Sequence, residues 1–273
     1  MHTFLGFYNN QTIFLDYRQN NSSRVEYLSM FRKRKSNYLD LSIILTGFNE
    51  GPTVYKNLKT VKDLLNNSRY SWEIILYDDK SSDGTSEVFK KFASENKNIH
   101  AFFHTVNKGR GGTVKDAILK SKGKIVGYFD TDLELSPVYL FEFVNKIMDG
   151  YDVAIGRRYY TIGMANITRT ILSKGYIFLR RLLIGLPFKD TEAGIKFFNR
   201  EKILPVLKKV RDERWFFDTE VVARSYLEKL SIIEIPVVYV RNTEKKTSVK
   251  LLKDSFDYFR KLLIFRKIMN QFK

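Results

Sequence analysis

An apolar run that ends in two carboxylates has the clearest chemical potential in this sequence. The run extends from Ile125 to Phe129, and Asp130 and Asp132 follow it with one residue between them. If the run is a buried strand, its period of two directs both carboxylates to one side, at the strand end where open α/β sheets bind ligands. Mg²⁺ typically takes one or two carboxylates and completes its shell with substrate phosphates. The pair therefore predicts a metal site in an enzyme that handles a nucleotide diphosphate.

Three further polar motifs precede this pair, and each follows a predicted strand. They lie at residues 46–50, 77–85 and 107–112. Because parallel strands end at the same edge of a sheet, the motifs can converge with Asp130 and Asp132 on one crevice. This convergence is more specific than any single motif, since one glycine-rich stretch is also typical of a plain tight turn.

The side chains in these motifs offer the groups that a nucleotide needs. Glu50 and Asp79 can accept hydrogen bonds from ribose hydroxyls and a base N–H, and Phe48 can pack against the base. Lys108 and Arg110 supply positive charge, and the glycines beside them let the backbone approach a ligand closely. Together the motifs predict a binding site for the nucleotide part of a substrate.

Alternating strands and helices must position these motifs. Apolar runs predict strands at 41–45, 73–77, 99–103, 125–129, 153–155 and 232–240. Periodicity and caps predict helices at 52–65, 83–92, 112–121, from Pro137 onwards, 168–186, 217–230 and 249–272. This alternation favours an α/β fold with a mostly parallel sheet, flanked by helices and connected by right-handed crossovers.

The composition excludes several classes of site. The chain has no cysteine, so it has neither a disulfide framework nor a thiolate metal site. Its three histidines argue against a histidine metal centre or a Ser-His-Asp triad. The net charge of +17 indicates an anionic partner, namely a phosphorylated substrate, an anionic membrane surface or nucleic acid. Because no basic-aromatic nucleic-acid motif is present, we expect no nucleic-acid partner.

The chain divides into three predicted parts. Residues 1–38 form a polar and basic extension, residues 39–248 a catalytic domain, and residues 249–273 a basic amphipathic tail. The tail and a candidate interfacial helix at 168–186 are of the type that lies in a membrane interface, although a helix packed on the core would also show an apolar stripe. With no apolar run of about 18 residues and no signal sequence, we expect no transmembrane helix and a cytoplasmic protein, peripheral on the cytoplasmic face of a membrane.

The four motifs also carry a resemblance to a known family. The order T-G-F-N-E, D-D-K-S-S-D-G-T, N-K-G-R-G-G and D-T-D resembles glycosyltransferase family 2, whose GT-A fold is a Rossmann-like sheet flanked by helices. Residues 190–198 are similar to the D-T-Q-x-G-F-K-x-F segment of polyprenyl-phosphate hexosyltransferases, and residues 214–220 to their R-W-x-F-D-x-E segment. Over residues 40–250 the chain looks closest to dolichyl-phosphate glucosyltransferases, with dolichyl-phosphate mannose synthases as near relatives.

The resemblance implies a role for each of the early motifs. Asp79 and Glu50 would hold the nucleoside, and Asp130 the ribose or another part of the donor. Asp132 would bind a metal ion, Mg²⁺ or Mn²⁺, with Glu134 as the candidate second ligand. The residues expected at the donor are Phe48, Glu50, Asp79, Lys108, Arg110, Gly111, Asp130, Thr131 and Asp132.

The later segments would serve catalysis and the acceptor. Catalytic roles are expected for Asp132, for Asp190 near the donor sugar, and for Asp218. Trp215 and Glu220 would shape the far wall of the site together with Asp218. Contacts with the acceptor or with a phosphate are expected from Arg157, Arg158, Lys196, Arg214, Lys246 and Lys250.

Two departures from the family pattern are visible. Thr46 replaces the proline that is common in the first motif, which is a mild change. Relatives often carry Ser-Lys after the last strand, whereas Val249 separates Ser248 from Lys250 here. The lysine that clamps a phosphate therefore stays open among Lys245, Lys246 and Lys250.

These observations predict an inverting glycosyltransferase that moves a hexose, with UDP-glucose favoured as donor, to a dolichyl-type polyprenyl phosphate at a membrane surface. A phosphate oxygen is already a nucleophile, because the second pKa of a phosphate monoester is about 6. Two alternatives stay within the fold. The donor could be GDP-mannose or a UDP-N-acetylhexosamine, or the acceptor could be a hydroxyl of a polysaccharide, protein or lipid, which needs a base such as Asp218 or Asp190. A non-catalytic membrane-binding or nucleic-acid-binding protein with an inactive core is the alternative from another class.

Overall fold

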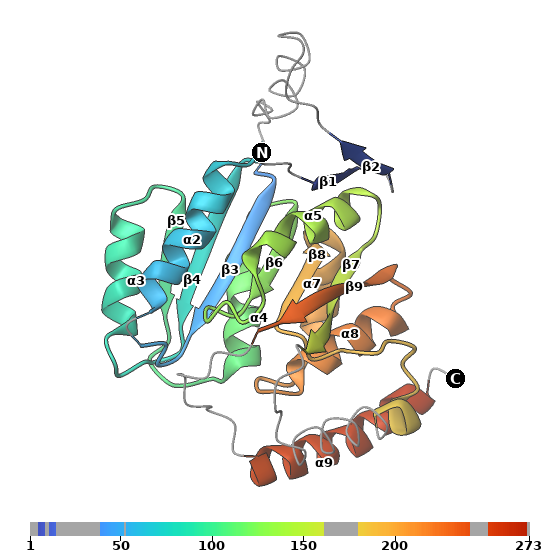
Figure 1. Ribbon diagram of the computed structural model, residues 1–273. Helices are drawn as coiled ribbons and strands as arrows, with labels where there is room; N and C mark the ends of the chain where they lie inside the picture. The colour runs from blue at the N-terminus through green and yellow to red at the C-terminus, as the bar shows by residue number, and fades with distance from the viewer. Residues whose placement is uncertain are drawn as a thin grey trace.

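A seven-stranded sheet forms the centre of the computed structural model, which describes residues 5–8, 11–14, 39–51, 53–160, 180–240 and 251–271 (Figure 1). The strand order is β5-β4-β3-β6-β8-β7-β9. The strands are β3 (Leu41–Gly47), β4 (Trp72–Asp78), β5 (Ile99–Phe103), β6 (Ile125–Phe129), β7 (Val153–Tyr160), β8 (Ile195–Asn199) and β9 (Ile232–Tyr239). A separate antiparallel pair, β1 (Leu5–Tyr8) and β2 (Gln11–Phe14), occurs within the predicted N-terminal extension.

All strands of the large sheet except β8 run in one direction. β3 is parallel to β4 and β6, β4 to β5, and β7 to β9, whereas β8 is antiparallel to both of its neighbours, β6 and β7. The prediction of a mostly parallel sheet is therefore confirmed. Because β8 is reversed, the residues that precede it lie at the edge where the other strands end.

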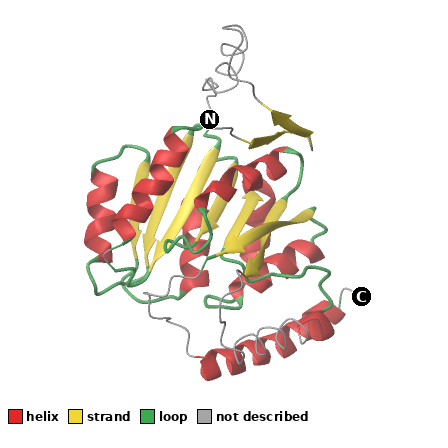
Figure 2. Ribbon diagram, in the orientation of Figure 1, coloured by secondary structure: helices red, strands yellow, loops and turns green. Residues whose placement is uncertain are grey.

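Helices cover both faces of this sheet (Figure 2). α2, α3 and α5 pack on one face, and α4, α7 and α8 on the other. α9 packs on α8 instead of on the sheet. The helices are α2 (Val54–Asn66), α3 (Thr85–Ser94), α4 (Arg110–Lys120), the 3₁₀ helix η1 (Pro137–Tyr139), α5 (Leu140–Met148), α7 (Arg200–Lys209), α8 (Phe217–Leu227) and α9 (Leu251–Asn270).

The strands read as apolar runs because both of their faces are covered. In β3, Leu41, Ile43 and Leu45 join the core on the α2 side, and Ile44 joins the core on the α4 side. In β6 the same alternation places Phe129 on the α2 side. This period of two directs the polar residues that follow each strand to defined sides of one edge.

The structure differs from the predicted elements at several points, which include the unpredicted pair β1 and β2. β7 continues to Tyr160, beyond the predicted end at residue 155, and β8 and α7 are not predicted at all. The sequence does not predict β8 because a fully buried lysine, Lys196, interrupts its apolar residues. Of the predicted helix at 168–186, Arg180 to Ile184 are helical, and residues 168–179 lie outside the described part of the chain. Across the described ranges, no helix is both long enough and apolar enough to cross a membrane.

Candidate active site

Asp79 anchors the glycine-rich loop that follows β5. The residue is only 3% exposed, and its Oδ1 accepts a hydrogen bond from the Lys108 backbone N–H at 2.8 Å. Its Oδ2 accepts from the Gly109 N–H at 2.7 Å, and the His104 ring lies 2.9 Å from Oδ1 through Nδ1. Asp79 thus shapes the loop through three neighbours, while its expected contact with the nucleoside stays a prediction.

His104 is a site residue that the sequence motifs do not reveal. Its Nε2 lies 3.0 Å from Asp116 Oδ2, which also accepts from Lys108 Nζ at 2.6 Å. Burial would raise the pKa of Asp116, but the hydrogen bonds from Lys108 and His104 outweigh it and hold that pKa below its usual value. The ammonium of Lys108 therefore has a carboxylate partner in this structure, and its expected role at the donor stays a prediction.

Arg110 joins the two halves of the site. Its Nε and Nη2 donate to Asp130 Oδ1 at 2.9 and 2.7 Å, and its Nη1 donates to Asp218 Oδ2. The guanidinium also lies over the ring of Tyr128, 5.5 Å from its centroid. The third motif is thereby linked to the fourth and to the segment at residues 214–220, which supports the predicted convergence on one site.

Asp218 is the centre of a buried charge cluster. Its Oδ1 accepts from Lys196 Nζ and from Tyr128 Oη, both at 2.6 Å, and its side chain is 5% exposed. Burial opposes ionisation, but the charges of Arg110 and Lys196 outweigh it and lower the pKa of Asp218. A carboxylate with these partners holds its charge and positions Arg110.

Lys196 has its partners inside the protein. Its side chain is fully buried, and its Nζ donates to Asp218 at 2.6 Å and to the Ala193 carbonyl oxygen at 2.7 Å. In this structure Lys196 is the counter-ion of Asp218, and its expected contact with a phosphate stays a prediction. Its burial follows from the place of β8 inside the sheet, where both faces are covered.

The carboxylates after β6 are more open. The Asp130 side chain is 46% exposed, and Asp132 and Glu134 are half-buried. Asp132 Oδ1 accepts from the Glu134 N–H at 3.2 Å, and a Glu134 carboxylate oxygen accepts from the Tyr239 hydroxyl. Burial, the hydrogen bond to Glu134 and the nearby carboxylate charges all raise the pKa of Tyr239. Tyr239, at the end of β9, is a second site residue that the sequence motifs do not reveal.

Thr131 lies between the two aspartates but points elsewhere. It is 2% exposed, and its Oγ1 donates to the Thr46 carbonyl oxygen at 2.8 Å. Gly111 is also buried. It packs so closely on α8 that a Cβ at this position would lie 2.3 Å from Phe217 Cβ. Both residues hold neighbouring elements together, and their expected donor contacts stay predictions.

Gly194 is in close contact with Asp130. A Cβ at Gly194 would lie 1.9 Å from Asp130 Oδ2, a distance that no side chain can occupy. The segment before β8 therefore supplies a glycine so that the backbone can pass the carboxylate of Asp130. This contact explains the glycine in the motif at residues 190–198.

The donor set fits a divalent cation that shares its shell with a substrate. The described part of the chain contains no cluster of three or more His, Cys, Asp or Glu side chains that could enclose a metal. Mg²⁺ and Mn²⁺ suit oxygen ligands, and Mg²⁺ is commonly held by one or two carboxylates plus substrate phosphates. Asp132 and Glu134, linked by a hydrogen bond and half-buried, fit such a site.

Asp190 and Arg158 form a bidentate pair at the end of β7. Arg158 Nε and Nη2 donate to the two carboxylate oxygens at 2.7 and 3.0 Å, and the Arg158 N–H donates at 3.1 Å. Burial opposes ionisation of Asp190, but Arg158 outweighs it and lowers the pKa of the carboxyl. The neighbouring Arg157 lies over the Tyr159 ring at 4.9 Å.

Of the remaining predicted residues, Glu220 is 3% exposed and accepts from Arg224 Nε at 2.7 Å, and the others lie at the rim or outside the described chain. Phe48 and Trp215 are 43% and 38% exposed, and Glu50 is half-buried. Arg214 is exposed, and its Cγ is so close to Gly109 that it limits the space beside the glycine-rich loop. Three lysines proposed for phosphate contacts lie outside the described residues, namely Lys245, Lys246 and Lys250.

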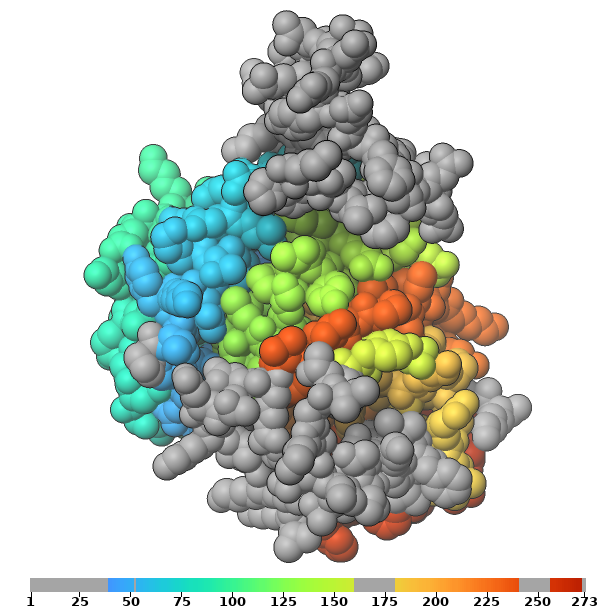
Figure 3. Space-filling view, in the orientation of Figure 1, coloured from blue at the N-terminus to red at the C-terminus, as the bar shows by residue number. Residues whose placement is uncertain are grey.

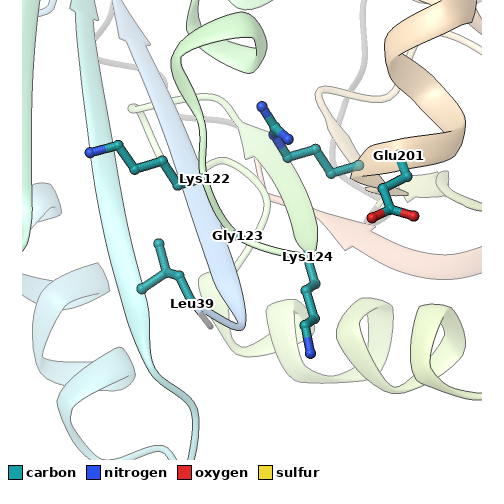
Figure 4. Close-up of a pocket in the computed structure, with 6 residues that line it drawn as sticks. Leu39, Lys122, Gly123, Lys124 and Glu201 are labelled. Carbon is teal, nitrogen blue, oxygen red and sulfur yellow. The ribbon is translucent and has the colours of Figure 1, made fainter. Parts of the chain in front are cut away.

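A hollow at the opposite end of the sheet is separate from this site. It is lined by Leu39, Lys122, Gly123, Lys124, Arg200 and Glu201 (Figure 4). Its floor is the turn before β6, where the Gly123 N–H donates to Ser42 Oγ and the Lys122 N–H to Glu73 Oε1, both at 2.7 Å. The hollow contains none of the predicted site residues.

Comparison with known proteins identifies the family. The profile described as Glycosyl transferase family 2 matches residues 42–205, more than half of the chain. The chain belongs to glycosyltransferase family 2. This transferase is 29% identical over 221 residues to Glycosyltransferase AglD of Haloferax volcanii, an alignment that covers 79% of the transferase and 35% of AglD. It is 26% identical over 252 residues to Dolichyl-phosphate beta-glucosyltransferase of Saccharomyces cerevisiae, covering 83% of the transferase and 74% of the yeast protein.

The fold of the transferase is also similar to solved structures. Glucosyl-3-phosphoglycerate synthase from Mycobacterium tuberculosis in complex with uridine-diphosphate superposes with a TM-score of 0.63 at 17% identity. The match covers 84% of the transferase and 80% of the synthase. This likeness confirms the predicted GT-A fold.

Proposed function

We propose that this transferase moves glucose from UDP-glucose to a dolichyl-type polyprenyl phosphate, with inversion at the sugar C1. The relative from Saccharomyces cerevisiae is named a dolichyl-phosphate beta-glucosyltransferase, which supports both the donor sugar and the acceptor class. The two segments that resemble those of polyprenyl-phosphate hexosyltransferases support the acceptor further, and the bond from Lys196 to Asp218 joins them in the fold.

One observation carries the choice of a phosphate over a hydroxyl acceptor. A hydroxyl needs a general base whose pKa lies near the working pH. The two candidates for that base, Asp190 and Asp218, are each ion-paired, and the pKa of each is lowered. A phosphate monoester is ionised at neutral pH and attacks without a base. The paired state of these aspartates therefore favours a phosphorylated acceptor.

The donor would be held by the open carboxylates. A divalent cation, Mg²⁺ or Mn²⁺, bound by Asp132 and Glu134 would stabilise the charge on the departing diphosphate. Asp130 would accept hydrogen bonds from donor hydroxyls, in the orientation that Arg110 gives it. Phe48, which is exposed at the end of β3, would pack against the base.

The acceptor would approach from the side of β7. Arg157, Arg158 and the exposed Arg214 would offer positive charge to its phosphate, and the net charge of +17 would favour an anionic lipid. Because the acceptor is a lipid, the transferase would work at a membrane surface. Its peripheral position on the cytoplasmic face stays a prediction.

A transfer assay with the full chain tests this proposal. UDP-glucose, GDP-mannose and UDP-N-acetylglucosamine are offered in parallel with a polyprenyl phosphate and with the matching polyprenol, in Mg²⁺ and in Mn²⁺. We expect glucosyl transfer to the phosphate and none to the alcohol. Asp132→Asn should lower transfer at least about 100-fold, the scale typical for loss of one transition-state contact. Asp149→Asn, at an exposed site after α5, is the matched control and should retain full activity.

Each other outcome changes a specific part of the proposal. Transfer to the polyprenol would assign a hydroxyl acceptor and contradict the argument from the paired aspartates. Transfer from GDP-mannose alone would keep the acceptor and replace the donor. If the wild-type chain bound no nucleotide, the hypothesis of a non-catalytic protein would replace the proposal of an enzyme.

A further inference from the structure

The end of β9 is attached to the loop that carries the two candidate metal ligands. Leu135 and Tyr239 form an antiparallel bridge, and the Val240 N–H donates to the Glu134 carbonyl oxygen at 2.9 Å. Figure 1 shows the tip of β9 beside the loop that follows β6, and in the space-filling view β9, drawn in orange, lies against green residues from the region of β6 and α5 (Figure 3). The backbone of β9 therefore fixes the place of Glu134 at the edge of the sheet.

The side chain of Tyr239 continues this attachment. Its hydroxyl donates to a carboxylate oxygen of Glu134, and its ring packs on the core cluster on the α2 side of the sheet. Because packing restricts the rotamers of a ring, the hydroxyl is presented to the carboxylate from a fixed position. One strand thus holds Glu134 both by its backbone and by its side chain.

This attachment leaves Glu134 able to bind a cation. A carboxylate offers about four lone-pair sites, so the bond from Tyr239 leaves acceptor capacity on Glu134. Asp132 lies on the other side, where its Oδ1 accepts from the Glu134 N–H at 3.2 Å. A glutamate that is ordered only when a ligand binds loses side-chain entropy at that moment, and a bond that orders it beforehand removes this cost.

We propose that Tyr239 is a positioning residue for the metal site, and that its hydroxyl orients the Glu134 carboxylate for a divalent cation shared with the donor diphosphate. This inference rests on the proposed metal site at Asp132 and Glu134. Tyr239 acts through Glu134, since its hydroxyl is engaged as a donor to that carboxylate. Groups that orient a metal ligand in this way typically change metal affinity by roughly 10- to 100-fold when they are removed.

A second tyrosine offers a matched control. The Tyr139 hydroxyl accepts from the Val238 N–H at 3.0 Å, so it also secures the end of β9. Its bond goes to the backbone of the strand, whereas that of Tyr239 goes to the candidate ligand. Tyr139→Phe therefore measures the effect of a loosened strand end, and Tyr239→Phe adds the effect on Glu134.

Manganese binding by the full chain tests the inference. Mn²⁺ is titrated in the presence of saturating UDP, and the free ion is measured by electron paramagnetic resonance. Tyr239→Phe keeps the ring and removes the hydroxyl, so we expect the Kd for Mn²⁺ to rise by at least about tenfold. UDP binding without metal should be unchanged, and Tyr139→Phe should bind Mn²⁺ as wild type does. A wild-type Kd in Tyr239→Phe, or an equal rise in Tyr139→Phe, would overturn the positioning role.

A double variant decides whether Tyr239 acts through Glu134. Glu134→Ala should weaken Mn²⁺ binding at least as much as Tyr239→Phe, and the second substitution should cause little further loss in that background. Additive losses would contradict action through Glu134. Excess Mn²⁺ should also restore transfer by Tyr239→Phe to the wild-type level, because only metal affinity is lowered. A variant that had lost its fold would not recover in this way.

Transfer to a polyprenyl phosphate separates this inference from the proposed function. If the wild-type chain transfers glucose and Tyr239→Phe binds Mn²⁺ equally well, the inference is wrong and the function stands. If Tyr239→Phe weakens Mn²⁺ binding and no polyprenyl phosphate accepts glucose, the positioning role is supported and the acceptor is wrong. If the wild-type chain transfers glucose but binds neither Mn²⁺ nor Mg²⁺, the metal site and the role of Tyr239 are both overturned.

Discussion

The carboxylates after β6 and those of the late segments differ in exposure. Asp130 also accepts from Arg110, but its side chain is 46% exposed, whereas those of Asp190 and Asp218 are 13% and 5% exposed beside their arginine or lysine partners. An open carboxylate can meet a metal ion or a sugar. An enclosed one holds its cations in place and resists protonation. The comparison divides the site into a donor-facing set and a supporting set.

The largest expected effect is a loss of stability when the charge of Asp218, in the supporting set, is removed. Asp218→Asn leaves Lys196 and Arg110 without this counter-ion, and removal of one partner from a buried pair typically costs about 3–5 kcal/mol in the free energy of unfolding. Denaturant unfolding of wild type and variant measures this loss. The double variant Asp218→Asn with Lys196→Met should recover part of it, because the buried cation is then gone. Equal stability of wild type and Asp218→Asn would show that the cluster is not a supporting element.

A substitution at Gly194 tests the close contact between the segment before β8 and Asp130. Gly194→Ala forces Asp130 to move, because the new Cβ would lie 1.9 Å from its Oδ2. We expect donor transfer to fall by at least about tenfold, which corresponds to a loss of roughly 1.4 kcal/mol in transition-state binding. Gly185→Ala is the control, since its φ of +65° is strained but nothing lies within 4 Å of a Cβ there. Equal transfer losses in both variants would mean that general strain, and not Asp130, limits the activity.

A smaller effect is expected at His104, which supports the donor side through Asp79. His104→Gln keeps at most part of the hydrogen bonding to Asp79 and Asp116, so the glycine-rich loop should loosen. We expect KM for the donor to rise by roughly fivefold with little change in kcat, because one net hydrogen bond contributes about 1 kcal/mol. His100→Gln, at a half-exposed histidine near Glu73, is the matched control. A fall in kcat at unchanged KM would contradict a role in positioning the loop.

The smallest effect is a pH dependence of stability through Asp190. Its pKa is lowered in the folded state, so its contribution is present above the unfolded pKa of about 3.9 and is lost as pH falls through the folded value. Asp190→Asn should therefore be less stable than wild type at pH 7, and the gap should narrow below about pH 4. Unfolding free energies measured between pH 7 and pH 3 give this gap directly. A gap that stays constant with pH would show that the Arg158 pair contributes no charge-dependent stability.

The sequence predicts the convergence of the early motifs well. The alternation of apolar strands with helices implies parallel strands, whose ends share one edge of the sheet. In the structure, Arg110 of the third motif donates a hydrogen bond to Asp130 of the fourth. The late segments carry a weaker local signal, because β8 is short, is reversed and contains the buried Lys196. The resemblance implies a phosphate contact for this lysine, and only the fold reveals that it pairs with Asp218.

The sequence alone therefore determines the α/β class, the edge at which the site lies and the residue types available there. These follow from local periodicity and from the short connections that parallel strands require. Only the tertiary structure decides which carboxylates are open and which are enclosed. Asp218 meets Arg110 across 108 positions of the chain, and Gly194 meets Asp130 because β8 turns back beside β6. Burial and pairing across such distances depend on how the layers pack, and no local pattern of residues records that packing.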